Sequence, residues 1–292
     1  MRIVRLGIVL FIICMGIFFL WKFFPHASFS LEQTDTRPLI VTTIFPLYDI
    51  AKQVGGDTIR VELILPPGGS EHTFEPTPKA QRAIEDADII FSIGHGLDNW
   101  LYNLTSDPSK ILPVDSGIAL KEDKEIDPHY WLTLENGALI ASFMAVRIGE
   151  LIPEQTEEIR LRTEAYLVLL ASTDRDLKDR LSHLVQKKIV TFHDAWAYFA
   201  EAYGLEIVGT FEPTAGREPT PQYLFALKEI VVKNHLSALY AEPQFSSRGI
   251  ESFIKDYDLT LAVLDPLGGG ELTSSYIELI TYNVETILHN QK

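Results

Sequence analysis

The sequence predicts an α/β protein with two similar lobes, each a parallel sheet flanked by helices, joined by one long backbone helix. From Leu39 onward, short apolar runs rich in β-branched residues alternate with segments of helical period. After Lys188 a similar order returns, because "KIVTFHDAWAYFAEAYGLEIVGTF" resembles "LIVTTIFPLYDIAKQVGGDTIRVELIL". Between the two halves lies a long amphipathic stretch that neither Gly nor Pro interrupts.

The first half begins with a strand–helix–strand unit. "LIVTTIF" is typical of a strand, "PLYDIAKQVGG" of a helix closed by glycine, and "IRVELIL" of a second strand. The segment "PKAQRAIEDA" predicts another helix, and "DIIFSIG" and "ILPVDSG" predict two further strands. Strands separated by helices favour a parallel sheet covered by those helices.

The second half repeats this order and is connected to the first by the long helix. "SALYAEP" corresponds to "DIIFSIG", and "LAVLDPLGG" corresponds to "ILPVDSG". The linking stretch has one apolar stripe, formed by Ile159, Tyr166, Leu170, Leu177, Leu181 and Leu184. About thirty helical residues would span about 45 Å, so one helix could brace both lobes and limit their closure. We therefore expect lobes at 39–152 and 188–292, and a linking helix at 153–187.

The amino terminus is typical of an export signal. Arg2 and Arg5 precede an unbroken apolar run from Leu6 to Trp21. Residues 1–30 are thus a signal peptide or, as we favour, an uncleaved membrane anchor followed by a tether at 31–38. The body is then extracytoplasmic, in the periplasm or at the cell surface, and held at the cytoplasmic membrane. Cys14 is the only cysteine, so the exported body has no internal disulfide.

The net charge of the chain indicates which classes of ligand and partner it can bind. The chain has 25 Lys and Arg against 40 Asp and Glu, a formal net charge of −15. Such a surface repels phosphate backbones, which argues against nucleic acid and favours cationic ligands. We expect a monomer.

Three histidines share a context that suggests a metal site. His72 follows the second predicted strand, His129 lies where the chain leaves the first lobe, and His193 follows a strand of the second lobe. Asp265 also follows a strand, although by itself it also fits an N-cap or turn aspartate before a proline. Because carboxyl ends of parallel strands face the ligand crevice, these side chains could meet there. Three imidazoles and one carboxylate suit tetrahedral Zn²⁺, but the spacings are too long for a local motif.

A family resemblance adds weight to this hypothesis. "TTIFPLYDIAKQVGG", "EHTFEPTP", "DPHYWL", "TFHDAWAYFAEAYGL", "EPQFSS" and "LDPLGGG" resemble, in order, successive blocks of the metal-binding solute receptors of bacterial ABC importers for zinc and manganese. The resemblance implies a metal in the cleft between the lobes and an ABC permease as partner. It also implies the metal ligands His72, His129, His193 and Asp265, and a receptor that is not an enzyme.

The chain departs from this family in some places. Many zinc receptors of the family carry a histidine-rich loop where this chain has only "LKEDKEI". His95 stands where the family requires no histidine, and we interpret it as a loop residue near the cleft rim. Glu71 could also bind the metal, in place of Asp265 or together with it, but Asp265 is the preferred candidate ligand. The acceptors that could orient the imidazoles are Asp127, Asp194 and Glu242.

The ligand set predicts the metal. Members that resemble manganese receptors place a carboxylate where this chain has His193, and three imidazoles with one carboxylate favour Zn²⁺ over the harder Mn²⁺. We therefore expect Zn²⁺ as the transported ligand. The alternatives are a manganese receptor of the same family, a zinc-dependent hydrolase, and a surface adhesin on the same scaffold. No HExxH pair supports the hydrolase.

Overall fold

The computed structural model describes residues 35–291 apart from 123, 213–218 and 246–249. The chain divides into two compact units, Met1–Thr36 and Arg37–Lys292, and the second contains all the elements described below. The predicted signal or anchor at 1–30, and the first half of the tether (31–34), lie outside the described residues. Within the described ranges, no helix is both long enough and apolar enough to cross a membrane.

The first sheet contains four parallel strands in the order β2-β1-β3-β4. Its strands are β1 (Leu39–Thr42), β2 (Arg60–Leu63), β3 (Ile89–Ser92) and β4 (Ile111–Pro113). β1 and β3 are buried along their whole length, as central strands covered on both faces should be. This sheet and its helices α2 (Phe45–Gly55) and α3 (Pro78–Asp86) are called the first lobe.

The second sheet has the corresponding order β6-β5-β7-β8 and is also parallel. Its strands are β5 (Lys188–His193), β6 (Glu206–Glu212), β7 (Ala238–Ala241) and β8 (Thr260–Val263). We call this sheet, with α6 (Ala197–Tyr203), α7 (Pro221–Lys233) and α8 (Glu251–Asp256), the second lobe. The shared strand order confirms the two related α/β lobes that the repeated sequence blocks predict.

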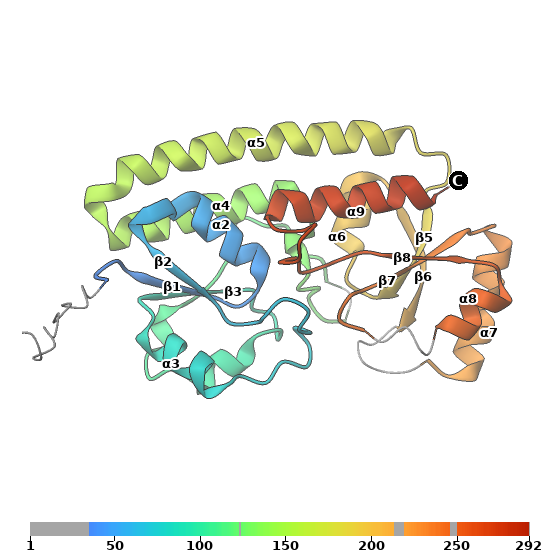
Figure 1. The fold of residues 1–292 in the computed structure, drawn as a ribbon, viewed down its shortest axis with the longest axis horizontal. Coiled ribbons are helices and arrows are strands. Elements are labelled where there is room, and N and C mark those ends of the chain that lie inside the picture. Colours follow the sequence, from blue (N-terminus) through green and yellow to red (C-terminus); the bar gives the residue numbers. More distant parts are fainter. Residues whose placement is uncertain (1–34, 123, 213–218, 246–249, 292) are drawn as a thin grey trace, which may run out of the picture. The chain divides into compact units, whose positions relative to one another are not determined.

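Three further helices serve both lobes. They are α4 (Leu134–Leu151), α5 (Thr156–Ser182) and α9 (Tyr276–Asn290), and Figure 1 shows them stacked on one side of the two sheets. Short 3-10 turns complete the structure at Gly56–Thr58, Asn99–Asn103, Pro108–Lys110, Tyr130–Leu132 and Pro153–Gln155. The helices α3, α7 and α8 cover the opposite faces of their sheets, so each lobe has helices on both sides.

The predicted linking helix is α5, which has 27 residues. It is shorter than the expected 153–187, because Pro153–Gln155 form a separate 3-10 turn before it and the helix ends at Ser182. The expected stripe faces inward: Leu184 is partly buried, and the other five stripe residues are buried. They belong to one hydrophobic core that runs from the first sheet through α4, α5 and α9 into the second lobe. Opening the lobes would therefore expose apolar surface.

Tyr276, the first residue of α9, connects this helix to the first lobe through hydrogen bonds. Its backbone N–H donates to the buried carboxylate of Asp49 at 2.9 Å. Its hydroxyl is directed at two backbone carbonyls, those of Trp131 at 2.7 Å and Thr133 at 2.6 Å. The Trp131 indole in turn donates to the carbonyl of Pro266 at 2.7 Å, in the loop that leads from β8 to α9. Buried hydrogen bonds therefore hold the two lobes in one relative position.

Gly137 permits the close approach of α4 to Tyr276. A Cβ built on Gly137 would lie 2.3 Å from Cε1 of the Tyr276 ring. We expect Gly137→Ala to lower the free energy of unfolding by about 1–3 kcal/mol, because the ring is already held by its hydroxyl and cannot easily move. Urea unfolding followed by circular dichroism measures this loss.

Gly149 provides a matched control on the same helix. Its added Cβ would meet Thr156 Oγ1 at 3.5 Å, an ordinary contact. Gly149→Ala should be neutral or stabilising by up to about 1 kcal/mol, because alanine is the better helix former. Equal destabilisation by the two substitutions would show that close packing on Tyr276 is not the cause.

Candidate metal centre

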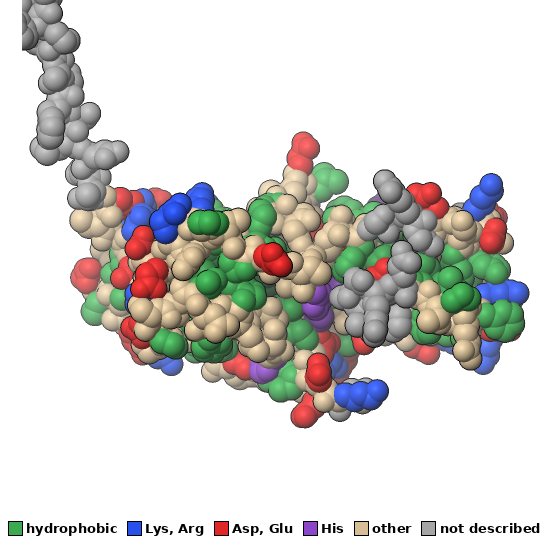
Figure 2. Space-filling view, turned by 90° about the horizontal axis from the view of Figure 1, so that it is seen from below, with side chains coloured by type: hydrophobic (Ala, Val, Ile, Leu, Met, Phe, Trp, Pro, Cys, Tyr) green, Lys and Arg blue, Asp and Glu red, His purple; other side chains and the backbone are tan. Residues whose placement is uncertain are grey.

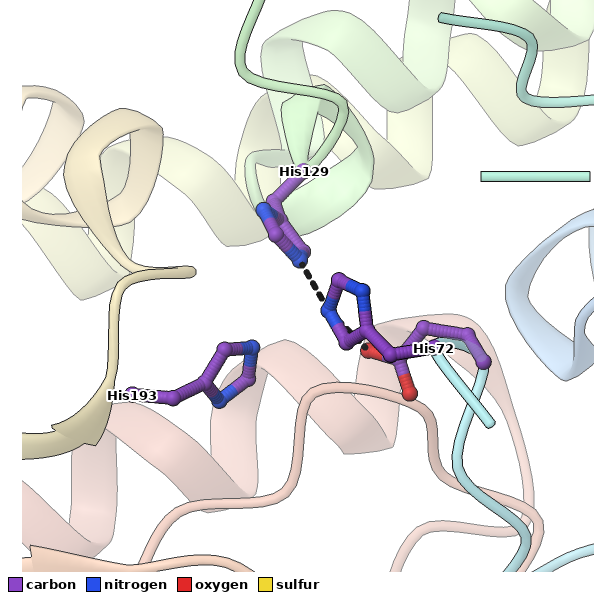
Figure 3. A group of neighbouring side chains, drawn as sticks. His72, His129 and His193 are labelled. Atoms are coloured by element: carbon purple, nitrogen blue, oxygen red, sulfur yellow. Dashed lines mark hydrogen bonds and ion pairs between the residues drawn. The ribbon is translucent and has the colours of Figure 1, made fainter. Parts of the chain in front are cut away.

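Three imidazoles converge where the two lobes meet. His72 lies in the loop that follows β2, His129 directly precedes the 3-10 turn Tyr130–Leu132, and His193 is the last residue of β5. The ring centroids of each pair are 5.4 Å apart, and the Nε2 atoms of His72 and His129 are separated by 3.4 Å. Figure 3 shows the three rings facing one another from separate parts of the chain. The expectation that these histidines meet is therefore in agreement with the structure.

Glu71 is the carboxylate that completes this group. One ligand atom from each of Glu71, His72, His129 and His193 lies within 4.8 Å of the others. Tetrahedral Zn²⁺ with bonds of about 2.0–2.1 Å needs its ligand atoms about 3.3 Å apart, so a small contraction would bring these four into coordination. The loop before Glu71 contains Gly68 and Gly69, and Gly68 has a φ of 79°, a conformation that glycine adopts without strain.

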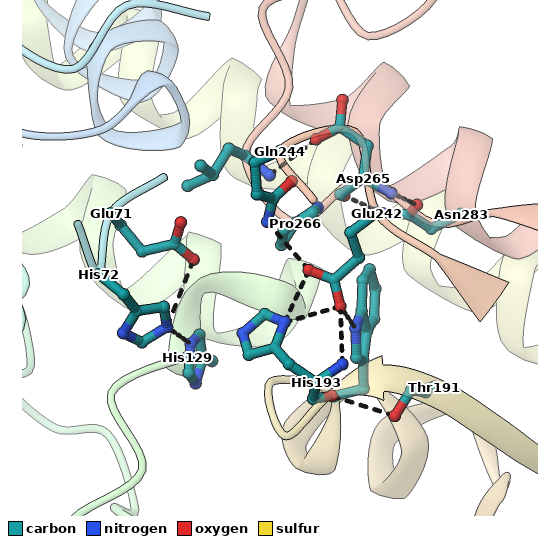
Figure 4. A network of polar contacts seen from close by, with 12 residues as sticks. Glu71, His72, His129, Thr191, His193, Glu242, Gln244, Asp265, Pro266 and Asn283 are labelled. Carbon is teal, nitrogen blue, oxygen red and sulfur yellow. Dashed lines mark hydrogen bonds and ion pairs between the residues drawn. The ribbon is translucent and has the colours of Figure 1, made fainter. Parts of the chain in front are cut away.

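Asp265, the expected fourth ligand, is not brought into this group. Its Oδ1 accepts hydrogen bonds from the backbone N–H groups of Leu267 at 3.0 Å and Gly268 at 2.8 Å, and its Oδ2 accepts one from the Thr273 hydroxyl at 3.2 Å. Figure 4 shows Asp265 apart from the three imidazoles. Here it has the turn-forming role that its position before Pro266 also predicted. In the sequence, the feature that indicated Glu71 as a candidate ligand was its position next to His72.

Two carboxylates orient the imidazoles from behind. Asp127 Oδ1 accepts from both the backbone N–H and the Nδ1 of His129, at 2.9 Å and 2.8 Å. Glu242 lies 2.7 Å from Nδ1 of His193. Protonation of Nδ1 against a carboxylate leaves the Nε2 lone pair free for a metal. Asp194, the third acceptor expected, is exposed, and the acceptor at the His193 ring is Glu242.

Glu242 is itself held firmly. The Trp196 indole donates to its Oε1 at 3.1 Å, and the Gln244 amide donates to its Oε2 at 2.9 Å. The Glu242 carboxylate is fully buried. Together with the backbone N–H and the ring Nδ1 of His193, these make four donors around one buried anion, which fixes the tautomer and the direction of the His193 ring.

Buried polar atoms without hydrogen-bond partners indicate a cation-binding site. Among the described residues, both carboxylate oxygens of Glu71 and Nε2 of His193 are buried and accept no hydrogen bond. Leaving such groups unsatisfied costs about 1–3 kcal/mol each, and more when they carry charge. A divalent cation among the four side chains would satisfy all three atoms at once. The donor set therefore fits a metal ion.

The electrostatics of the group favour a cation. Burial, followed by the nearness of the other two imidazoles, lowers the pKa of His72 to about 3, so its ring is neutral at pH 7. Burial raises the pKa of Glu71. At His193 burial acts to lower the pKa, but the hydrogen bond and the charge of Glu242 outweigh it, and the pKa is raised. The raised pKa values of His193 and Glu71 mean that protons compete with a metal at both groups.

The site is only partly closed to solvent. The side chain of His72 is 26% exposed, whereas those of His129 and His193 are 4% and 2% exposed. Figure 2, seen from the side opposite α5, shows histidine surface at the junction of the lobes. Of the three imidazoles, that of His72 is therefore the one most accessible from solvent.

His95 does not belong to the metal group. It adopts a left-handed conformation with a φ of 52°, and its Nε2 lies 2.9 Å from Asp115. Its ring packs edge-on against Tyr130. This is consistent with our interpretation of His95 as a loop residue.

Comparison with known proteins identifies the family. The model of the family described as "Zinc-uptake complex component A periplasmic" matches residues 40–290. The chain belongs to this family. Its fold agrees, because a solved structure titled "Crystal structure of ZnuA" is similar with a TM-score of 0.80 and 27% identity, covering 88% of this chain and 100% of that one. The chain is thus a metal-binding, substrate-binding protein of the ABC importer type, in a family of solute-binding proteins and not of enzymes.

Relatives in this family are named for different metals. The manganese-binding lipoprotein MntA of Halalkalibacterium halodurans is 28% identical over 260 residues, which cover 85% of this chain and 87% of the relative. The zinc-binding lipoprotein AdcA of Streptococcus pneumoniae is 30% identical over 264 residues, which cover 84% of this chain but only 53% of AdcA. Similarity to these relatives therefore leaves zinc and manganese both open for this chain.

The structure predicts which carboxylate binds the metal. Glu71→Gln should weaken Zn²⁺ binding by at least about tenfold, because the neutral amide loses both the charge and the second oxygen donor. Asp265→Asn should change affinity by less than about threefold, since the amide oxygen can still accept from the turn N–H groups. Calorimetry with a competing chelator measures both, and the substitutions are matched in size and charge. The opposite ranking would restore Asp265 as the ligand.

Proposed function

We propose that the protein captures Zn²⁺ outside the cytoplasm with His72, His129, His193 and Glu71, and delivers it to an ABC permease for import. The observation that carries this proposal is the convergence of three imidazoles whose rings face one another, two of which are oriented by carboxylates at Nδ1, Asp127 at His129 and the buried Glu242 at His193. Neutral imidazoles are borderline ligands that Zn²⁺ binds well. The N-terminal segment would keep the body at the cytoplasmic membrane.

Zinc is the better fit on chemical grounds. Three nitrogens and one carboxylate suit a four-coordinate borderline ion, and the Irving–Williams order places Zn²⁺ well above Mn²⁺. Mn²⁺ prefers more oxygen ligands, and here the second acidic candidate, Asp265, is engaged in its turn. The hydrolase alternative is disfavoured, because a fourth protein ligand would occupy the position that a catalytic water needs.

Direct competition tests the metal. Protein purified without added metal should contain zinc on elemental analysis, and Zn²⁺ should displace Mn²⁺ at equal concentrations. His193→Glu should narrow the ratio of Zn²⁺ to Mn²⁺ affinity by at least about tenfold, because it exchanges a nitrogen for a hard oxygen and adds negative charge. A wild-type preference for Mn²⁺ would make this a manganese receptor.

Zinc-limited growth after deletion of the permease separates import from an adhesin role.

Zinc affinity should fall on acidification. Metal binding requires neutral His193, whose pKa is raised, so protons begin to compete above its ordinary value of about 6.5; Glu71, also raised, adds to the loss at lower pH. His72 contributes only near its pKa of about 3. Titrations between about pH 5.5 and about pH 8 measure this slope.

Glu242→Gln is the control for this pH dependence. Removing the negative charge should lower the pKa of His193 and move the loss of affinity to lower pH, while weakening binding about 10- to 100-fold at neutral pH through a less well oriented ring. An unshifted profile would show that His193 is not the group that protons occupy.

A further inference from the structure

A tyrosine of the second lobe holds the backbone of the first lobe beside the metal centre. The hydroxyl of Tyr198, on α6, accepts a hydrogen bond from the backbone N–H of Lys121 at 2.7 Å and donates one to the carbonyl of Asp127 at 3.3 Å. Lys121 and Asp127 are also joined directly, because the N–H of Asp127 donates to the carbonyl of Lys121 at 2.9 Å. One buried hydroxyl thus secures both ends of this short turn.

The turn leads directly to a metal ligand. Asp127 accepts from the backbone N–H and the ring Nδ1 of His129, so a displacement of Asp127 moves this imidazole. Because Asp127 lies only two residues before His129, little chain remains to absorb such a displacement. The position of the Asp127 backbone therefore sets the position of the His129 ring.

The helix that carries Tyr198 is equally tied to His193. α6 begins at Ala197, directly after Trp196, whose indole donates to the same Glu242 oxygen that holds the His193 ring. Trp196 and Tyr198 are both buried. The hydroxyl of Tyr198 thus has a fixed position relative to His193, and it contacts the segment that fixes His129.

We propose that Tyr198 is a positioning residue that sets His129 relative to His193 across the junction of the lobes. The inference rests on the proposed function and adds a residue that does not touch the metal. Its role is preorganisation: with the hydrogen bonds in place, the two imidazoles already face each other before the ion arrives. Without them, His129 must be ordered at each binding event, at a cost in affinity.

The Tyr198 hydroxyl should contribute more to zinc affinity than the solvent-exposed ion pair between Lys121 and Glu201. Lys121 also forms a salt bridge with Glu201 of α6, and its ammonium lies 5.4 Å from the centroid of the Tyr198 ring. The Glu201 side chain is 71% exposed, and such pairs contribute little. The contacts of Lys121 with the ring of residue 198 and with Glu201 remain available when the hydroxyl is removed, so the turn keeps its place approximately and loses only its exact alignment.

The test is Tyr198→Phe, compared with Tyr223→Phe. Tyr223 is the matched control, because its hydroxyl also donates to a backbone carbonyl, that of Thr210 at 2.7 Å, but within the second lobe. We expect Tyr198→Phe to weaken Zn²⁺ binding about five- to tenfold, mainly through faster dissociation, with the melting temperature of the metal-free protein near that of Tyr223→Phe. Tyr223→Phe and Glu201→Gln should leave zinc affinity within about twofold of wild type.

A double-mutant cycle with Asp127→Ala shows whether the effect passes through Asp127. Asp127→Ala should weaken binding about 10- to 100-fold. Adding Tyr198→Phe should then cost less than about twofold, because the backbone of residue 127 no longer holds the imidazole. Metal-edge X-ray absorption should show three imidazole ligands in wild type and a more disordered third ligand in Tyr198→Phe.

The outcomes are distinct. Failure of the wild type to bind Zn²⁺ overturns the proposed function itself. Wild-type binding with equal affinities for Tyr198→Phe and Tyr223→Phe overturns only the positioning role. Fully additive losses in the cycle, or a loss of affinity that follows a loss of stability in the metal-free protein, would give Tyr198 a merely structural part and also overturn it.

Discussion

The candidate metal centre depends on a fixed separation of the two lobes, because its imidazoles come from both of them. His72 and His129 belong to segments of the first lobe and its exit, and His193 ends a strand of the second. An error of about 1 Å in lobe position would spoil coordination at bond lengths of about 2 Å. The continuous core through α4, α5 and α9 therefore limits the motion that the site could not tolerate. The hydrogen bonds of Tyr276 and Trp131 act in the same direction.

The burial of polar groups at this site has a cost in free energy that a bound cation would offset. Glu71 and the Nε2 atom of His193 are buried without hydrogen-bond partners among the described residues, which is unfavourable unless a cation contacts them. Such destabilisation is tolerated because the core elsewhere is extensive. It also means that an ion gains from satisfying groups that water reaches poorly.

Much of the fold could be predicted from the sequence, because it depends on local pattern. The alternation of strands and helices, the repeated blocks and the stripe from Ile159 to Leu184 are properties of neighbouring residues, and the structure confirms them. The meeting of His72, His129 and His193 followed from strand ends and family resemblance together. The choice between Glu71 and Asp265 could not follow in this way. It depends on where a glycine-containing loop directs one side chain and on which backbone N–H groups the other finds, and both are tertiary properties.

The shared strand order of the two sheets also bears on how such a site could arise. Aligning Thr42 of β1 with Thr191 of β5, which pair with β3 and β7 in the same way, places His193 opposite Ile44 of the first lobe. Ile44 is a buried core residue, 2% exposed. The position that supplies an imidazole of the candidate site in one lobe therefore supplies packing in its counterpart. If the lobes descend from one duplicated unit, the two copies have diverged at this position, one carrying a packing residue and the other an imidazole at the junction of the lobes.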